Sequence, residues 1–202
     1  MMNGYPSFSL NQNGHQNDSS SQTNIHKAFQ SRRKIEIDDE DLLILLNDSD
    51  LSRQFDHTKF SIEHCKLLIS AVNSSLAPGL DKLSFERFKY VFELLLTWRN
   101  LFRRHDLDRN GIIETYALVN ILNSLRFNLP PSTLEIIVKR YSTRHDGQLK
   151  ICFEHYIQLC ARLTLLNDLM QQKQQSNVDT NVSPRDVCSF SIDEFMQLAL
   201  TL

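Results

Sequence analysis

The stretch from Asp106 to Ala117 carries the residue types and spacing of a calcium-binding loop. Side chains that bear oxygen stand at its first, third, fifth and ninth positions, as Asp106, Asp108, Asn110 and Glu114. Calcium loops of this kind take ligands from positions 1, 3, 5, 7 and 9 and close with a bidentate glutamate at position 12. The carboxylate and amide oxygens of this stretch are therefore candidate ligands for a hard divalent cation.

Two further positions of this loop fit the pattern and one does not. Gly111 stands at the sixth position, where the backbone turns sharply, and Ile112 offers its carbonyl at the seventh. The twelfth residue is Ala117, which has no side-chain oxygen. Without the closing glutamate we expect weak calcium binding, with a Kd on the order of 10⁻⁴ M or higher, or none at cytosolic levels. A small octahedral cation such as Mg²⁺, aided by Glu114, is the alternative.

Composition places the chain among soluble globular proteins. Its 202 residues are 41% hydrophobic and 23% charged, enough for one domain with a buried core. A formal net charge of −2 gives no electrostatic case for a nucleic-acid partner. No apolar run reaches the ~18 residues of a membrane span, so we expect no stable membrane insertion. Four widely spaced cysteines without a C-x-x-C pair indicate the free thiols of a cytoplasmic protein.

The sequence pattern divides the chain into two regions. Residues 1–24 are rich in Asn, Ser and Gln and predict a disordered tail, whereas residues 25–202 predict a folded domain. Apolar stripes at helical spacing dominate this domain, and short β-prone triplets stand just before the helices. The stripes predict helices that begin near Asp38, Ser61, Ser84, Thr115, Pro130, Phe153 and Ser191. We expect an all-α fold in which a helix–loop–strand–helix unit recurs five times, with a polar loop over residues 171–187.

Several motifs along the chain have the spacing of one known family. They are Phe60–Cys65, Phe85–Tyr90, Trp98–Phe102, the Asp106 loop, Leu122–Pro130, Ile136–Tyr141, Cys160–Leu163 and Ile192–Leu198. Over residues 25–202 this pattern resembles the penta-EF-hand family, and within it the calcium-binding domain of calpains. The resemblance implies five helix–loop–helix units, or hands, with short antiparallel β pairings between their loops.

The resemblance also assigns a closing residue to the other loops. In the first loop the closing acid aligns with Asp41, and Arg33 and Lys34 take the places of earlier acidic ligands. The second loop is lengthened and closes at Arg87, and the fourth closes at His155. Because cationic side chains at ligand positions repel Ca²⁺, we expect these sites to be lost. The remaining candidate metal site consists of Asp106, Asp108, Asn110, Ile112 and Glu114.

The fifth hand has no partner hand within the chain. In the family it pairs with its counterpart in another chain, and without that partner its apolar helix face would be exposed. The expected dimer interface consists of Ile192, Phe195, Met196 and Leu198. The partner would be a second copy, giving a homodimer, or a calpain catalytic chain, giving a heterodimer. Family grooves near the first two hands imply an amphipathic-helix peptide as a further ligand.

The sequence does not indicate a catalytic centre. Cys65, His145 and His155 are present, but nothing matches the nucleophile signature of papain-like proteases. Cys65 stands on an apolar helix face, where a structural thiol is expected. A non-catalytic, calpain-like regulatory or scaffold subunit is therefore the leading interpretation. Two alternatives stay open: a calcium-dependent penta-EF-hand adaptor of the sorcin or grancalcin type, and the C-terminal piece of a calpain cysteine protease.

Overall fold

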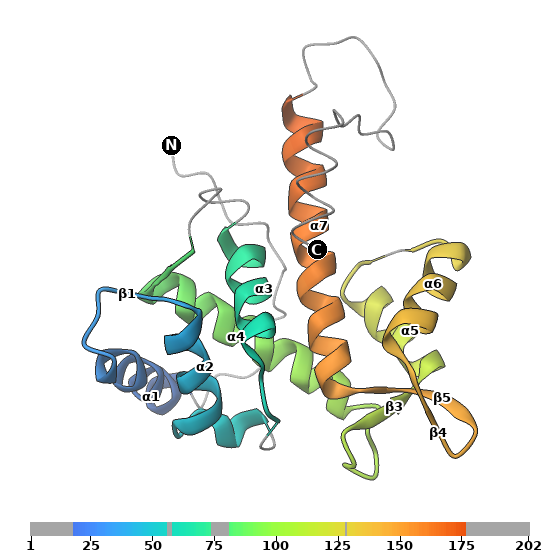
Figure 1. The fold of residues 1–202 in the computed structure, drawn as a ribbon, viewed down its shortest axis with the longest axis horizontal. Helices are drawn as coiled ribbons and strands as arrows, with labels where there is room; N and C mark the ends of the chain where they lie inside the picture. The colour runs from blue at the N-terminus through green and yellow to red at the C-terminus, as the bar shows by residue number, and fades with distance from the viewer. Residues whose placement is uncertain (1–17, 56–57, 74–80, 128, 177–202) are drawn as a thin grey trace.

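A computed structural model describes residues 18–55, 58–73, 81–127 and 129–176 of the chain (Figure 1). Its helices are α1 (Asp18–Ser31), α2 (Asp39–Asp48), α3 (Ile62–Asn73), α4 (Phe85–Arg103), α5 (Thr115–Ser124), α6 (Pro131–Tyr141) and α7 (Phe153–Ser176), with a 3₁₀ helix η1 at Ser52–Phe55. Its strands are β1 (Glu36–Ile37), β2 (Leu83–Ser84), β3 (Ile112–Glu114), β4 (Thr143–His145) and β5 (Gln148–Cys152). This mostly helical architecture confirms the predicted fold class. No helix in this part of the chain is long and apolar enough to cross a membrane.

The elements form four consecutive hands within the described residues. The first hand is α1–β1–α2, the second α3–β2–α4, the third α4–β3–α5 and the fourth α6–β5–α7. Helix α4 leaves the second hand and enters the third, so one long helix serves both. The predicted fifth hand, including its triplet at residues 188–190, lies outside the described residues.

Local sequence explains where the helices begin. Asp38 caps α2, because its carboxylate accepts a hydrogen bond from Asp41 N at 3.0 Å while the Asp41 carboxylate accepts one from Asp38 N at 3.4 Å. Ser61 and His64 form a similar reciprocal pair before α3, with Ser61 Oγ 3.3 Å from His64 N and His64 Nδ1 3.0 Å from Ser61 N. Helix α6 begins with Pro131, whose fixed φ suits a first helical turn.

The strands join the loops in pairs. β1 is antiparallel to β2, with Ile37 opposite Leu83, and β3 is antiparallel to β5, with Ile113 opposite Ile151. All four of these side chains are buried, so each short ladder is also a core contact. The first hand is thereby coupled to the second, and the third hand to the fourth.

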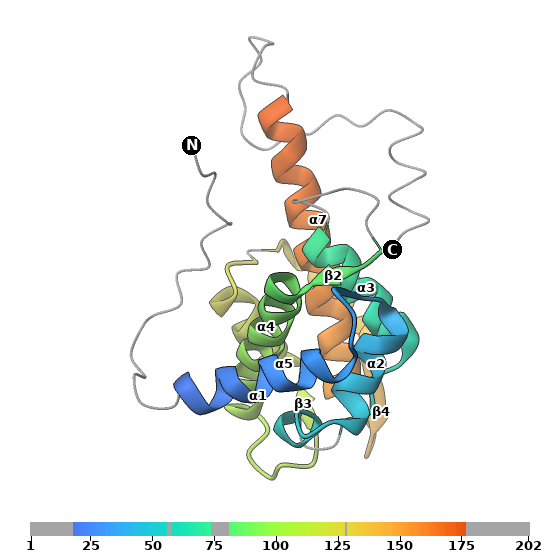
Figure 2. The ribbon, with the colours of Figure 1, turned by 90° about the vertical axis from the view of Figure 1, so that its left-hand side faces the viewer.

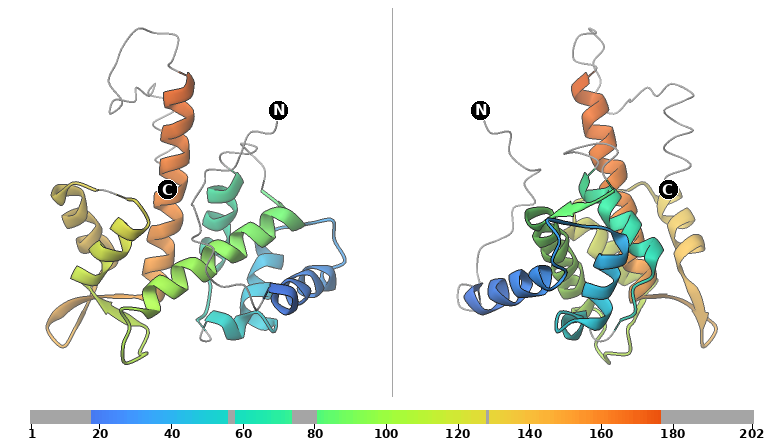
Figure 3. Two further views of the ribbon diagram at one scale, coloured as in Figure 1. Left: turned by 180° about the vertical axis from the view of Figure 1, so that it is seen from behind. Right: turned by 60° about the vertical axis from the view of Figure 1, so that its left-hand side comes forward.

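Two helices hold the two pairs of hands together. In Figures 1 and 3, α4 runs from the first pair to the second, and α7 stands between α3 on one side and α5 and α6 on the other. Trp98 and Phe102 of α4 and Tyr156 of α7 are fully buried, and Tyr156 Oη donates to the Trp98 carbonyl at 3.2 Å. Figure 2 shows α1 lying across α4, where the rings of Phe29 and Phe85 pack with centroids 5.3 Å apart.

Three features differ from the sequence-based expectation. Residues 18–24, predicted as part of the tail, form the start of α1. Burial of Ile25 and Phe29 anchors this helix, and adding residues to a helix that has already formed costs little free energy. Helix α7 continues to Ser176, within the segment predicted as a polar loop. Strand β4 is an additional element, paired with β5 through a two-residue turn at residues 146–147.

Candidate functional site

The third loop has the backbone path of a cation-binding hand. Asp106 is buried at its start, and its two carboxylate oxygens accept hydrogen bonds from the N–H groups of Asn110 at 3.1 Å and Gly111 at 3.0 Å. Positive φ values at Arg109 (56°) and Gly111 (77°) turn the chain back toward this carboxylate. Asp106 therefore organises the loop through backbone contacts.

The other predicted ligands of this loop contact protein groups. Asn110 Nδ2 donates to Asp108 Oδ2 at 2.8 Å, and Asn110 Oδ1 accepts from Ile112 N at 2.9 Å. Glu114 Oε1 lies 3.3 Å from Nζ of Lys150, its partner across the β3–β5 ladder. In this cross-strand ion pair Lys150 competes with a cation for the Glu114 carboxylate.

The closing position of the third loop supplies no ligand. Ala117 lies in the first turn of α5 and is only 2% exposed. Among the residues that the structure describes, no three His, Cys, Asp or Glu side chains gather in a group that could hold a metal ion. A cation in this loop would be held by Asp106, Asp108, Asn110 and the Ile112 carbonyl, a set that lacks the closing carboxylate of a tight calcium site.

Burial and a neighbouring carboxylate set the pKa of Asp106. Burial raises the pKa of Asp106, and the nearby charge of Asp108 adds to the rise. Hydrogen bonds from Gly111 and Asn110 oppose it without cancelling it, so the pKa stays above its ordinary value.

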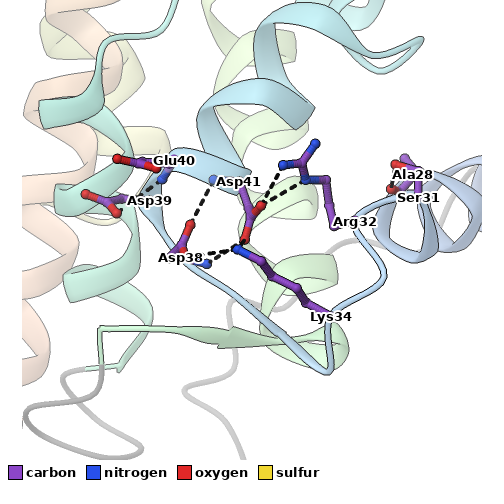
Figure 4. Close-up of polar contacts among 8 residues, drawn as sticks. All are labelled: Ala28, Ser31, Arg32, Lys34, Asp38, Asp39, Glu40 and Asp41. Carbon is purple, nitrogen blue, oxygen red and sulfur yellow. Dashed lines mark hydrogen bonds and ion pairs between the residues drawn. The ribbon is translucent and has the colours of Figure 1, made fainter.

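Ion pairs close the first loop (Figure 4). Asp41 stands at the closing position with a side chain only 2% exposed. Its Oδ1 accepts from Arg32 Nε at 2.9 Å, and its Oδ2 lies 2.6 Å from Lys34 Nζ. Lys34 also reaches Asp38 Oδ2 at 3.2 Å. The sequence pointed to Arg33 and Lys34 as the cations of this loop, and the structure places Arg32 rather than Arg33 against Asp41.

These contacts determine the charge state of Asp41. Burial favours a higher pKa for Asp41, but hydrogen bonds from Lys34, Arg32 and the Asp38 N–H outweigh it and lower the pKa. The pKa of Lys34 is raised, first by its bond to Asp41 and then by its bond to Asp38. Because the folded-state pKa of Asp41 lies below its ordinary 3.8, its stabilising contribution is complete above that pH and is lost as the pH falls through the lower value.

In the second hand, the arginine at the closing position bridges the two helices. Nη1 of Arg87, near the start of α4, donates to Asn73 Oδ1 at 3.1 Å. Asn73 ends α3, is buried, and donates from Nδ2 to the Lys82 carbonyl at 3.1 Å. The guanidinium thus links the entering and leaving helices of the hand, the link that a bound calcium ion provides elsewhere.

The fourth loop is a β-hairpin instead of a chelating ring. β4 and β5 pair through the turn Asp146-Gly147, where φ is 51° and 80°. The Asp-Gly pair is a sequence signal for such a turn and could have predicted it. The closing residue His155 places Nδ1 2.9 Å from the Tyr141 carbonyl, and since a carbonyl only accepts, Nδ1 is the donor.

The first, second and fourth hands therefore share one arrangement. In each, the closing residue (Asp41, Arg87 or His155) makes a direct polar contact with its own loop or with the end of the entering helix. Protein groups make these contacts, so they persist without a metal ion. The hands whose calcium sites were predicted to be lost are the hands that carry such links.

His64 connects the two pairs of hands. It lies half-buried on α3, which packs against α7, and interacts with Glu154 in the first turn of α7. Its Nδ1 accepts from Ser61 N, so this cap requires the neutral ring. Burial lowers the pKa of His64 below 6.5 and nearby His155 adds to this, while Glu154 and Glu63 act in the opposite direction.

Mild acid is expected to weaken the start of α3. Because the pKa of His64 is lower in the folded than in the unfolded chain, stability falls as the pH drops below 6.5. His64→Asn keeps an acceptor for the Ser61 N–H but does not titrate, so its stability should change less between about pH 7 and pH 5. Urea denaturation at both pH values measures this difference. A pKa of 6.5 or above for His64 by NMR would contradict it.

Two of the cysteines, Cys65 and Cys160, are packing residues. Cys65 and Cys160 are buried and free. Burial, aided by the charges of Asp39 and Glu63, raises the pKa of Cys65 to about 12, and burial also raises the pKa of Cys160. A thiol that stays protonated is a poor nucleophile.

The predicted interface residues Ile192, Phe195, Met196 and Leu198 lie outside the described residues, so the dimer interface stays a prediction.

Several known proteins are similar to this chain in sequence, although no family model matches it. Sorcin of Mus musculus is 31% identical over 143 residues, which cover 71% of this chain and 65% of sorcin. Human (Homo sapiens) calpain-9 is 31% identical over 144 residues, 71% of this chain and 19% of calpain-9. Grancalcin of Mus musculus is 27% identical over 167 residues, 83% of this chain and 69% of grancalcin. The chain thus spans less than two thirds of sorcin and about a fifth of calpain-9.

A solved structure shares the fold over nearly the whole chain. It is a homolog of programmed cell death 6 protein from Leishmania major Friedlin, with a TM-score of 0.55, 15% identity, and coverage of 93% of this chain and 92% of that one. The sequence relatives, this shared fold and the paired hands joined by α4 and α7 agree with the motifs read from the sequence. The chain belongs to the penta-EF-hand family.

Proposed function

We propose that this chain is a non-catalytic regulatory or scaffold subunit that dimerises and binds calcium weakly or not at all. The observation that carries the proposal is the direct closure of the first, second and fourth hands by protein groups. A hand whose helices are already joined by Asp41, Arg87 or His155 has no structural need for calcium. Such a subunit contributes binding surface and stability to an assembly and leaves any chemistry to its partner.

Calcium binding, where it occurs, is assigned to the third hand. Asp106 and Asp108 offer carboxylates as ligands. Glu114, however, is paired with Lys150, and Ala117 at the closing position has no side-chain oxygen. A ligand set of this kind suits a Kd on the order of 10⁻⁴ M or weaker. The site would then be mostly vacant at cytosolic calcium levels.

The proposed partner is another penta-EF-hand domain, bound through the fifth hand. A second copy of this chain and a calpain catalytic chain are the two candidates, and the similarity to part of calpain-9 supports the second. An amphipathic-helix peptide is a further candidate ligand for the first pair of hands. The free thiols of Cys65, Cys152 and Cys160 support a cytoplasmic location.

Phe195→Asp is expected to convert the dimer into a monomer, halving the mass measured by light scattering. A carboxylate in an apolar two-fold interface is present twice and loses its hydration on association, which costs several kcal/mol. The matched control is Ile35→Asp, the same kind of change at a side chain of the first loop that is 92% exposed, and it should leave the mass unchanged. A Phe195→Asp variant that stays dimeric would refute the proposed interface, and a native chain that is monomeric on its own would exclude the homodimer.

A calcium-dependent adaptor is the second candidate function. The favouring observation is that the matches cover 65% of sorcin and 69% of grancalcin but only 19% of calpain-9. Co-purification of a calpain catalytic chain from cells supports the regulatory subunit. Partitioning onto membranes only when calcium is added supports the adaptor.

A further inference from the structure

The β pairing establishes the position of each residue in the first loop. Ile37 faces Leu83 in the ladder of the first two hands, as Ile113 faces Ile151 in the ladder of the third and fourth. Ile113 is the eighth residue of the third loop, counted from Asp106. Counting from Ile37 as eighth places Arg32, Lys34, Asp38 and Asp41 at the third, fifth, ninth and twelfth positions, which are all ligand positions.

The side chains at these positions converge on one another as ligands do around a metal (Figure 4). Nζ of Lys34 lies 2.6 Å from Asp41 Oδ2 and 3.2 Å from Asp38 Oδ2, so one positive nitrogen contacts the carboxylates of the ninth and twelfth positions. Arg32 adds contacts from Nε at 2.9 Å and Nη2 at 2.8 Å to Asp41 Oδ1. Both Asp41 oxygens therefore have a cationic partner.

Because Asp41 is buried, the stability of the loop depends on these contacts. The side chain of Asp41 is 2% exposed, and a buried carboxylate without a partner is strongly destabilising. Its partners come from the segment after α1, while Asp41 itself lies in the first turn of α2. The cluster consequently ties the entering helix of the first hand to the leaving helix, which is the mechanical role of calcium in a loaded hand.

We propose that the ammonium of Lys34, supported by Arg32, replaces the metal ion in the first hand. The two helices of the hand are then held in one fixed arrangement by a cation that belongs to the chain and cannot dissociate. Through the β1–β2 ladder the second hand is held in the same state, bridged by its own Arg87–Asn73 contact. The first pair of hands presents one surface to its partners at every calcium concentration, and within the described residues calcium acts through the Asp106 loop of the second pair.

Amide hydrogen exchange of the full-length chain, read over residues 31–41 by mass spectrometry, tests this assignment. In the native chain this segment should exchange at the same rate in EDTA and in millimolar calcium. Lys34→Gln removes the ammonium and leaves Arg32 to pair with Asp41, so the chain still folds while the segment exchanges faster by roughly tenfold. The matched control is Lys139→Gln, because Lys139 pairs with Glu135 at 2.9 Å on an exposed face, and it should change nothing here.

A second experiment reverses the charge of the two cationic residues of the first loop. Arg32→Asp with Lys34→Asp supplies acidic ligands at the third and fifth positions in place of cations. Residues 31–41 should then exchange fast in EDTA and recover protection in millimolar calcium, whereas Arg32→Ala with Lys34→Ala should stay fast in both.

Two outcomes would overturn the assignment. One is that Lys34→Gln exchanges like the native chain, and the other is that calcium slows exchange of this segment in the native chain. The mass from light scattering, read on the same samples, reports dimerisation separately, so failure of the proposed interface and failure of this assignment are distinguishable.

Discussion

Ala117→Glu is expected to raise the calcium affinity of the third hand by at least about tenfold, from a Kd on the order of 10⁻⁴ M or weaker into the micromolar range. The physical reason is the return of two oxygens and one negative charge at the closing position. Ala117 is the third residue of α5, so a carboxylate there also interacts favourably with the helix N-terminus. Asp106 already holds the loop in shape through the N–H groups of Asn110 and Gly111.

Titration calorimetry of the native chain and the variant measures this effect. The native chain should give little heat below ~100 µM calcium, which is the lowest Kd expected for a site of the weak class. Ala117→Gln is the matched control, because it has nearly the size of the glutamate but neither its charge nor its second oxygen, and it should bind no better than the native chain. Micromolar binding by the native chain, or no gain in Ala117→Glu, would disprove the role assigned to this position.

Phe102→Ala is expected to lower the free energy of unfolding by about 3–5 kcal/mol. Phe102 is buried where α4 meets α7, with its ring centroid 5.0 Å from that of Phe153 and 5.2 Å from that of Tyr156. Its removal leaves a cavity that two aromatic neighbours on a rigid helix cannot fill. Its carbonyl also accepts from Asp106 N at 3.0 Å, so the change acts beside the third loop.

Urea denaturation followed by circular dichroism measures the loss. Leu101→Ala is the matched control, since Leu101 is the preceding residue of the same helix and only partly buried, and it should cost about 1 kcal/mol. A loss below about 1 kcal/mol for Phe102→Ala would show that α4 and α7 do not share a continuous core.

The proposed function depends on how the hands are closed. In a calcium sensor the closing glutamate follows the metal and moves the leaving helix when the ion arrives. Here the closing residues Asp41, Arg87 and His155 bond to protein atoms, so the corresponding motion has no trigger in three of the four described hands. A chain built in this way is suited to constant binding through the first pair of hands, with any response to calcium left to the Asp106 loop.

Much of the molecule follows from the sequence because its signals are local. The spacing of Asp106, Asn110 and Gly111 predicts the third loop, and the structure shows the backbone contacts that such a loop requires. Asp38 as a cap and the pair Pro130-Pro131 predict helix starts that the structure contains, the second helix beginning at Pro131. The identity of each closing residue followed from the family resemblance, which aligns Asp41, Arg87 and His155 with the closing position of their loops.

Only the tertiary structure showed which groups the closing residues Asp41, Arg87 and His155 contact. Arg33 takes a left-handed backbone conformation, with φ at 53°, and the side chains on either side of it in sequence, Arg32 and Lys34, meet at Asp41. Lys150 faces Glu114 only because β3 and β5 pair in one register. Such contacts join residues through packing and strand alignment, which spacing along the chain does not encode. The sequence thus determined which residue types stand at the ligand positions of each loop, and the fold determined that the closing residues of three hands bond to protein groups.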